Sequence, residues 1–272
     1  MCGDLFCARY VEKIFFILLL VAVHSAFGTA GQLATDRSAD ATSAAAYTGS
    51  SACKLCHSAH YDAWHETRHA RASFGCEACH GPGSAHVAAP SADTIITDRS
   101  SELCGRCHSR NNGTVIEAHS GCFKADQQYN QWRASPHWSV TPCTTCHDPH
   151  YSLATRQASA IKKSCTACHP GIKIFLGMQQ VGCERCHMPH ADARTTVSGV
   201  GPYRTGDRAT HIWRIKPEAT REELFSFNGT RAQFDSRGAY ITVDVSCLGC
   251  HNGKDARLYD VESVKQTAPL VH

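Results

Sequence analysis

Seven copies of one pentapeptide, Cys-x-x-Cys-His, constrain this chain more than any other feature of its sequence. They use fourteen of the seventeen cysteines and seven of the 18 histidines. The pattern is the attachment signature of c-type haem, in which two thiols bind the porphyrin and the following imidazole is the proximal iron ligand. The thioether positions are Cys53, Cys56, Cys76, Cys79, Cys104, Cys107, Cys143, Cys146, Cys165, Cys168, Cys183, Cys186, Cys247 and Cys250, and the proximal ligands are His57, His80, His108, His147, His169, His187 and His251.

The other common uses of cysteine pairs fit this pattern poorly. Zinc sites with four cysteines take the pairs two at a time and need no histidine after each, whereas here the pairs are odd in number and every one carries a histidine. A disulfide framework meets the same objection. Leu, Ile, Val and Phe are sparse beyond residue 30 for one large hydrophobic core. The sequence therefore predicts that seven covalently attached haem c groups fill much of the interior.

The sixth ligand of each iron decides between electron transfer and catalysis. Methionine is nearly excluded, because only Met178 and Met188 follow the first residue and Met188 adjoins a proximal histidine. Histidines outside the motifs supply one candidate for each of the seven irons. We predict this distal set to be His69, His86, His119, His137, His150, His190 and His211, and we assign no iron to His60, His65 or His272.

Two of these histidines occur in matched segments, CHDPH and CHMPH, three residues beyond a proximal histidine. A proline disfavours helical geometry in the residue before it. We therefore expect His150 and His190 to turn away from the haem of their own motif and toward another.

An apolar run at residues 14–23 follows Arg9 and Lys13 and precedes small residues. This is the layout of a signal peptide with cleavage after Ala30, which places the protein in the periplasm or at the cell surface. Membrane contact would follow only from an uncleaved leader. The predicted organisation is a signal peptide at 1–30, a flexible linker at 31–50, a heptahaem domain at 51–251 and a tail at 252–272.

Several segments resemble the exported multihaem c-type cytochromes. They are CKLCHSAHYDAWHETRHARA, GCEACHGPGSAH, QWRASPHW, CTTCHDPHYS and CERCHMPH, and the resemblance covers most of residues 51–251. This superfamily includes the tetrahaem cytochromes of the nitrifiers' hydroxylamine pathway and the periplasmic decahaem conduits of metal-reducing bacteria. The resemblance implies mainly short α-helices and loops around a stack of haems, seven here, with little β-structure. It also implies electron transfer between a quinol-side donor and an outer partner.

The longest gap between motifs, at 191–246, predicts an extended excursion or small subdomain before the seventh haem. It contains a helix-like EATREELF and runs into a β-like AYITVDVSC. The tail is expected to form one amphipathic helix between about Ala256 and Gln266. Outside the motifs and the leader, Cys122 is the odd cysteine, which predicts a buried thiol or an intermolecular disulfide, and we favour the buried thiol.

Three functions fit these features. The favoured one is a carrier that passes electrons along mostly bis-histidine haems between redox protein donors and acceptors. A reductase or oxidase of a small nitrogen or sulfur compound would need one open iron, and the histidine supply disfavours it. The third is a subunit of an extracellular cytochrome filament, in which the chain associates with itself.

Charge narrows the partners further. The formal charge is +3, and no run of Lys or Arg is long enough to bind along a phosphate backbone. Nucleic acid is therefore not an expected partner. Ionised propionates of seven ferric haems would bring the net charge to about −4. A basic protein or an extracellular metal oxide is then a better partner than an acidic surface.

Overall fold

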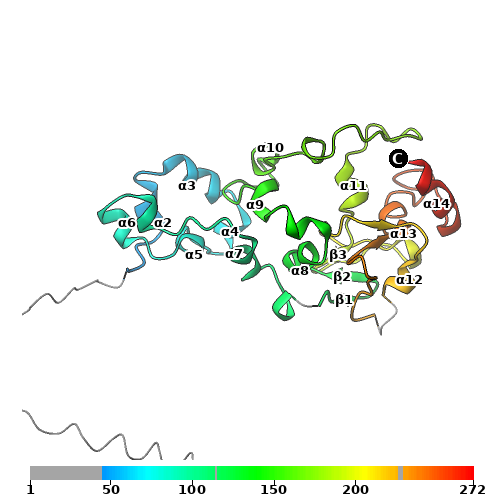
Figure 1. The fold of residues 1–272 in the computed structure, drawn as a ribbon, viewed down its shortest axis with the longest axis horizontal. Coiled ribbons are helices and arrows are strands. Elements are labelled where there is room, and N and C mark those ends of the chain that lie inside the picture. Colours follow the sequence, from blue (N-terminus) through cyan, green and yellow to red (C-terminus); the bar gives the residue numbers. More distant parts are fainter. Residues whose placement is uncertain (1–44, 114, 226–228) are drawn as a thin grey trace, which may run out of the picture. The chain divides into compact units, whose positions relative to one another are not determined.

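Short helices joined by long loops make up most of this protein (Figure 1). The structure is a computed structural model that describes residues 45–113, 115–225 and 229–272, so the predicted signal peptide and most of the linker lie outside the described residues. The α-helices in this part have four to eight residues and the strands two or three, which confirms the expectation of short helices, loops and little β-structure.

The bounds of the elements are as follows. The α-helices are α2 (Ser50–Lys54), α3 (Ser58–His65), α4 (Arg68–Arg71), α5 (Glu77–His80), α6 (Ser84–Ala88), α7 (Ser101–Gly105), α8 (Gln128–Arg133), α9 (Cys143–Cys146), α10 (Gln157–Ala160), α11 (Cys183–His187), α12 (Arg221–Leu224), α13 (Val243–Cys247) and α14 (Val261–Thr267). The 3-10 helices are η1 (Ala92–Thr94), η2 (Asn111–Gly113), η3 (Pro136–Ser139), η4 (Cys165–Ala167), η5 (Gly201–Tyr203) and η6 (Ala268–Leu270). The strands are β1 (Ala118–His119), β2 (Cys122–Lys124), β3 (Asp192–Ala193), β4 (Ile215–Lys216) and β5 (Ile241–Thr242).

Two small sheets tie distant parts of the chain together. In the first, β1 pairs antiparallel with β2, and β2 pairs parallel with β3 through Phe123 and Asp192. In the second, β4 pairs parallel with β5 through Ile215 and Ile241. The first sheet therefore brings the segment that follows the sixth motif against the middle of the chain.

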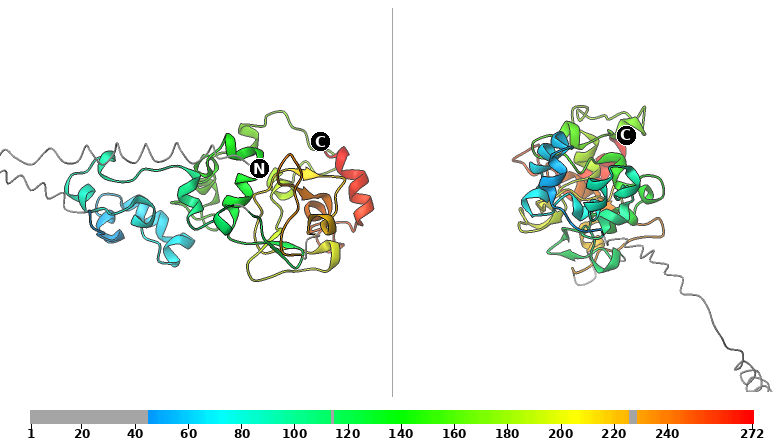
Figure 2. Two further views of the ribbon diagram at one scale, coloured as in Figure 1. Left: turned by 60° about the horizontal axis from the view of Figure 1, so that its bottom comes forward. Right: turned by 90° about the vertical axis from the view of Figure 1, so that its left-hand side faces the viewer.

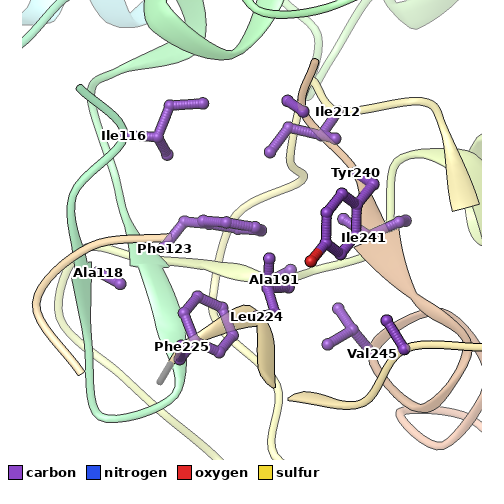
Figure 3. Packing of buried hydrophobic residues seen from close by; sticks show 12 residues of the cluster. Ile116, Ala118, Phe123, Ala191, Ile212, Leu224, Phe225, Tyr240, Ile241 and Val245 are labelled. Carbon is purple, nitrogen blue, oxygen red and sulfur yellow. The ribbon is translucent and has the colours of Figure 1, made fainter. Parts of the chain in front are cut away.

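The apolar core lies around these sheets (Figure 3). Phe123 meets Phe225 edge to face, with ring centroids 5.1 Å apart, a geometry that adds to the gain from burial. Before residue 116, Ala63 is the one apolar side chain that is buried among the described residues. The first part of the chain thus lacks a side-chain core, as the sparse apolar composition predicts. The core comprises Ile116, Ala118, Phe123, Ala191, Ile212, Ala219, Leu224, Phe225, Ala239, Tyr240, Ile241 and Val245.

Residues 191–246 supply much of this core and pack against the segment around β2 (Figure 3). The helix-like EATREELF forms α12, which begins at Thr220 with a capping box to Glu223. The β-like AYITVDVSC forms only the two-residue strand β5 and then turns into α13. The expectation of a longer strand is wrong, since residues 243–247 form α13, which packs against α14 and β5 with residues 243–246 all buried.

Both chain segments at the edges of the haem region are held by side chains. The carboxylate of Glu77 accepts hydrogen bonds from the backbone N–H groups of Thr48, Gly49 and Gly83, each 2.8 Å long, so the end of the predicted linker is bound. In the tail, α14 is shorter than expected because Asp260 caps it by accepting from Ser263 N–H at 2.7 Å.

Figure 2 shows the loops between these elements from two further sides. No helix in the described ranges is long and apolar enough to cross a membrane.

Candidate haem-binding sites

Each haem-attachment motif folds as one helical turn. In six motifs the backbone N–H of the histidine donates to the carbonyl of the first cysteine, at 2.9 to 3.0 Å, and the remaining motif is α11 itself. Residues three and four apart share one face of a helical turn. Both thiols and the imidazole of a motif can therefore reach one porphyrin, which is the geometry that the spacing predicts.

The thiols of consecutive motifs are neighbours. Burial and the adjacent Cys76 raise the pKa of Cys53, and burial and the adjacent Cys107 raise the pKa of Cys79. The same holds further along the chain, where Cys104 is close to Cys143, and Cys146, Cys165 and Cys186 are each close to a thiol of the following motif. The motifs therefore follow one another in space in the order of the sequence.

Six of the seven proximal histidines face a second histidine. Their ring centroids are 5.7 to 6.1 Å apart. An imidazole nitrogen binds a transition metal at about 2 Å, so two rings on opposite sides of one metal have centroids roughly 6 Å apart. The spacing fits an iron held between two imidazoles. The pairs are His57 with His86, His80 with His150, His108 with His69, His147 with His211, His169 with His137, and His187 with His272.

The sixth pair also shows which nitrogens face each other. The Nε2 atoms of His187 and His272 are 3.5 Å apart. The two cysteines of this motif and both rings line one hollow together with the apolar side chains of Ile174, Met178, Val181 and Val271. Thiols, facing imidazoles and apolar walls are the donor set and the surroundings that a c-type haem requires.

The outer nitrogen of several rings is bound to an oxygen. His80 Nδ1 lies 2.8 Å from Ile96 O, His187 Nδ1 lies 2.7 Å from Trp213 O, and His251 Nδ1 lies 3.0 Å from Arg257 O. A carbonyl oxygen can only accept, so Nδ1 carries the proton and the Nε2 lone pair remains for a metal. His86 and His150 are held in the same way, by Ser91 O and Asp148 Oδ1.

Local sequence explains where two of the partner rings sit. The Thr67 side chain accepts from Ala70 N–H and starts α4, which carries His69. Ser135 accepts from the N–H of His137 and Pro136 opens η3, which places His137. In both cases a short cap fixes the turn that presents the imidazole.

Burial keeps the inner rings neutral. Burial first, and the nearby His147 and His108 second, lower the pKa of His211 to about 3. Burial likewise lowers the pKa of His147 and of His137. A metal-binding imidazole must be neutral, so these environments favour the ligating form at neutral pH.

The predicted distal set is placed as follows. His69, His86, His137, His150 and His211 each face a proximal histidine, and His150 lies at the second motif instead of its own. His119 and His190 are exposed and make no ring contact with another histidine in the described part of the chain, and their ligation stays a prediction.

Sequence reasoning did not select His272, which faces His187 from 85 residues away. No local motif marks it, and only the fold brings the two together. His60 contacts the rings of His57 and His150, and His65 stacks on Tyr61, so both lie near the first two motifs without completing a pair. Cys122 is fully buried, as expected, and burial raises the pKa of its thiol.

Comparison with known proteins adds a sequence relationship. No protein-family model matches the chain. Over 122 residues it is 25% identical to the multihaem cytochrome MtrA of Shewanella baltica, which covers 42% of this chain and 31% of the relative. The chain thus spans about a third of the length of the curated relative that it matches.

Two solved structures are similar at lower identity. The octahaem sulfite reductase MccA of Wolinella succinogenes has a TM-score of 0.45 at 18% identity, over 64% of this chain and 34% of that one. An undecahaem cytochrome from the S-layer of Carboxydothermus ferrireducens has a TM-score of 0.37 at 17% identity, over 72% of this chain and 41% of that one. The chain is thus similar in sequence to a multihaem cytochrome, and its haem-attachment motifs carry histidines that face other histidines.

Proposed function

We propose that this protein is a heptahaem electron carrier, in which mostly bis-histidine haems pass electrons between exported redox partners. The observation that carries the proposal is the set of six facing histidine pairs, with ring centroids 5.7 to 6.1 Å apart. A sixth ligand from the protein closes an iron to substrate, so it favours electron transfer over catalysis.

Each part of the proposed site has its own task. The motif cysteines would hold the porphyrin, each proximal histidine would be one iron ligand, and His69, His86, His137, His150, His211 and His272 would each supply the second. Haem iron supplies one-electron chemistry when bound. The carbonyls on Nδ1 orient the rings, which tunes a metal centre from outside its ligands.

The proximity of the thiols of consecutive motifs supports a continuous path. Because each motif adjoins the next from the first to the seventh, seven haems would follow each other closely along residues 51–251. An electron that enters at one end of the series could leave at the other without a detour. This arrangement suits a conduit between two partners better than a single reaction centre.

The leader, the linker and the location belong to the same proposal. Residues 1–30 would direct export to the periplasm or cell surface and 31–50 would link them to the haem region. Redox proteins are the proposed donors and acceptors, with a metal oxide or a second copy of the chain as further candidates for the outer partner.

Intact mass spectrometry of the protein matured by a haem-attachment system tests the haem count. Seven haems should add about 0.6 kDa each to the mature chain. A homogeneous sample with six or fewer haems would contradict the proposal. The reduced protein should bind almost no carbon monoxide. Binding of one full equivalent of carbon monoxide would favour an open, reactive iron instead.

A further inference from the structure

The seventh motif is the one whose proximal histidine has no second histidine against its ring among the described residues. Tyr259 packs on His251 with ring centroids 4.8 Å apart, and Arg257 O holds its Nδ1. The six pairs therefore do not identify the sixth ligand of the haem at this motif. The inference below rests on the proposed function, in which a haem is bound at this motif.

Four histidines of the described residues remain as candidates for the sixth ligand of the seventh haem. They are His60, His65, His119 and His190. His60 and His65 lie on α3, beside the first motif. Consecutive motifs adjoin one another in sequence order, so the first and the seventh are at opposite ends of the series. His60 and His65 are thus far from the seventh haem along the path, which leaves His119 and His190.

A single segment, residues 203–206, connects His190 to the seventh motif. Gly206 N–H donates to His190 O at 2.8 Å. Thr205 lies so close to Gly249, between the two motif cysteines, that a Cβ there would come within 2.8 Å of Thr205 Cγ2. Tyr203 Oη donates to Tyr259 O at 3.0 Å, and Tyr259 is the residue that packs on His251.

The sixth motif, which His190 follows, is joined to the seventh directly. Ser246 Oγ, in α13, donates to Cys186 O at 2.7 Å. The thiols of Cys186 and Cys250 are neighbours. The chain that leaves α11 through Pro189 therefore lies beside the seventh motif. Two independent sets of contacts hold it there, one through residues 203–206 and one through α13.

The matched segment CHDPH shows that a histidine at this position can lie at a motif other than its own. His150 follows the fourth motif by three residues, yet its ring lies at His80 of the second motif, 6.0 Å between centroids. His190 has the same place in CHMPH, and its exposed imidazole is not engaged by another ring in the described residues. We propose that His190 is the sixth ligand of the haem attached at Cys247 and Cys250.

The test uses the mature holoprotein and carbon monoxide as the probe. Reduced wild type should bind almost no carbon monoxide, and His190→Ala should bind one equivalent and show one ferric high-spin haem. Added imidazole should return that haem to the low-spin state. His190→Met should stay low-spin, with one midpoint potential raised, because thioether ligation raises the potential.

His65→Ala is the control, since His65 stacks on Tyr61, faces no proximal ring and is assigned no iron. It should open no site, and an equivalent of carbon monoxide bound by this variant in place of His190→Ala would overturn the proposal. Wild type that already binds one equivalent, unchanged in His190→Ala, would overturn it too.

His272→Ala separates this inference from the proposed function. It should open the sixth haem, and the double variant His190→Ala/His272→Ala should bind two equivalents, because two different irons lose a ligand. If His272→Ala opens a site and His190→Ala does not, the inference fails and the six pairs stand. If neither opens a site, the assigned pairs fail as well.

Discussion

At the scale of single residues, the two nitrogens of each imidazole have different partners. A backbone or carboxylate oxygen accepts a hydrogen bond from the Nδ1–H of His80, His86, His150, His187 and His251. This bond fixes the tautomer and the direction of the ring before any metal arrives. The histidines are thus prepared as ligands by the folded chain itself.

One distal histidine should control one iron. His86→Ala should leave all seven thioether attachments intact and free a single coordination site at the first haem, because His86 is the ring that faces His57 at 6.1 Å. The reduced variant should bind about one equivalent of carbon monoxide. His65→Ala is the control, since His65 stacks on Tyr61 and faces no proximal ring. An unchanged low-spin spectrum in His86→Ala would contradict the pair.

Glu77 should make stability depend on pH. Burial alone would raise its pKa, but the backbone N–H groups of Thr48, Gly49 and Gly83 prevail and hold the pKa below its usual range. Such a carboxylate stabilises the fold fully above its unfolded pKa, and the stabilisation is lost as pH falls through the folded pKa. Glu77→Gln should lower the free energy of unfolding by about 1 to 3 kcal/mol near neutral pH.

The difference between wild type and Glu77→Gln should therefore be constant above about pH 5 and shrink below it. Denaturant unfolding of the holoprotein at several pH values measures this difference and cancels the other titrating groups. Glu262→Gln on α14 is the control, because its partner is one exposed side chain, Gln266. A difference that grows toward low pH would contradict the assignment.

At the scale of elements, the sequence predicts the motif turns well and the pairing of elements poorly. In six motifs, the hydrogen bond from the motif histidine to the first cysteine follows from the spacing alone. The pair of His187 and His272 does not, because it depends on how α11 and η6 meet across the fold. AYITVDVSC alternates like a strand, yet residues 243–247 form α13, which packs against α14 and β5.

The apolar core around the strands should be energetically separate from the ligand pairs. Leu224→Ala, at the end of α12, removes a fully buried side chain from this core and should cost about 2 to 5 kcal/mol of unfolding free energy. Chemical denaturation of the holoprotein measures the cost, and the haem count should remain the same. Val200→Ala is the control because Val200 is 77% exposed. Equal effects of the two substitutions would mean that the core does not stabilise the holoprotein.

At the scale of the whole molecule, two kinds of interior replace one large core. Residues 45–113 bury almost no apolar side chain within the described ranges, whereas the cluster around Phe123 and Ile241 is built from side chains alone. Haem is the expected filler of the first part, and side chains suffice in the second. This division explains why the composition predicts that one large hydrophobic core is absent and does not predict the small core around Phe123 and Ile241.

The arrangement of the motifs sets the redox behaviour of the whole protein. Bis-histidine ligation lacks the thioether that raises the potential in His/Met cytochromes, so most midpoints should lie below zero. Consecutive motifs adjoin one another, and reduction of one haem therefore disfavours reduction of its neighbours, which spreads the midpoints. A spectroscopic redox titration should give one broad wave that needs several one-electron components. A single sharp one-electron transition at high positive potential would contradict both the ligand pairs and the close series of haems.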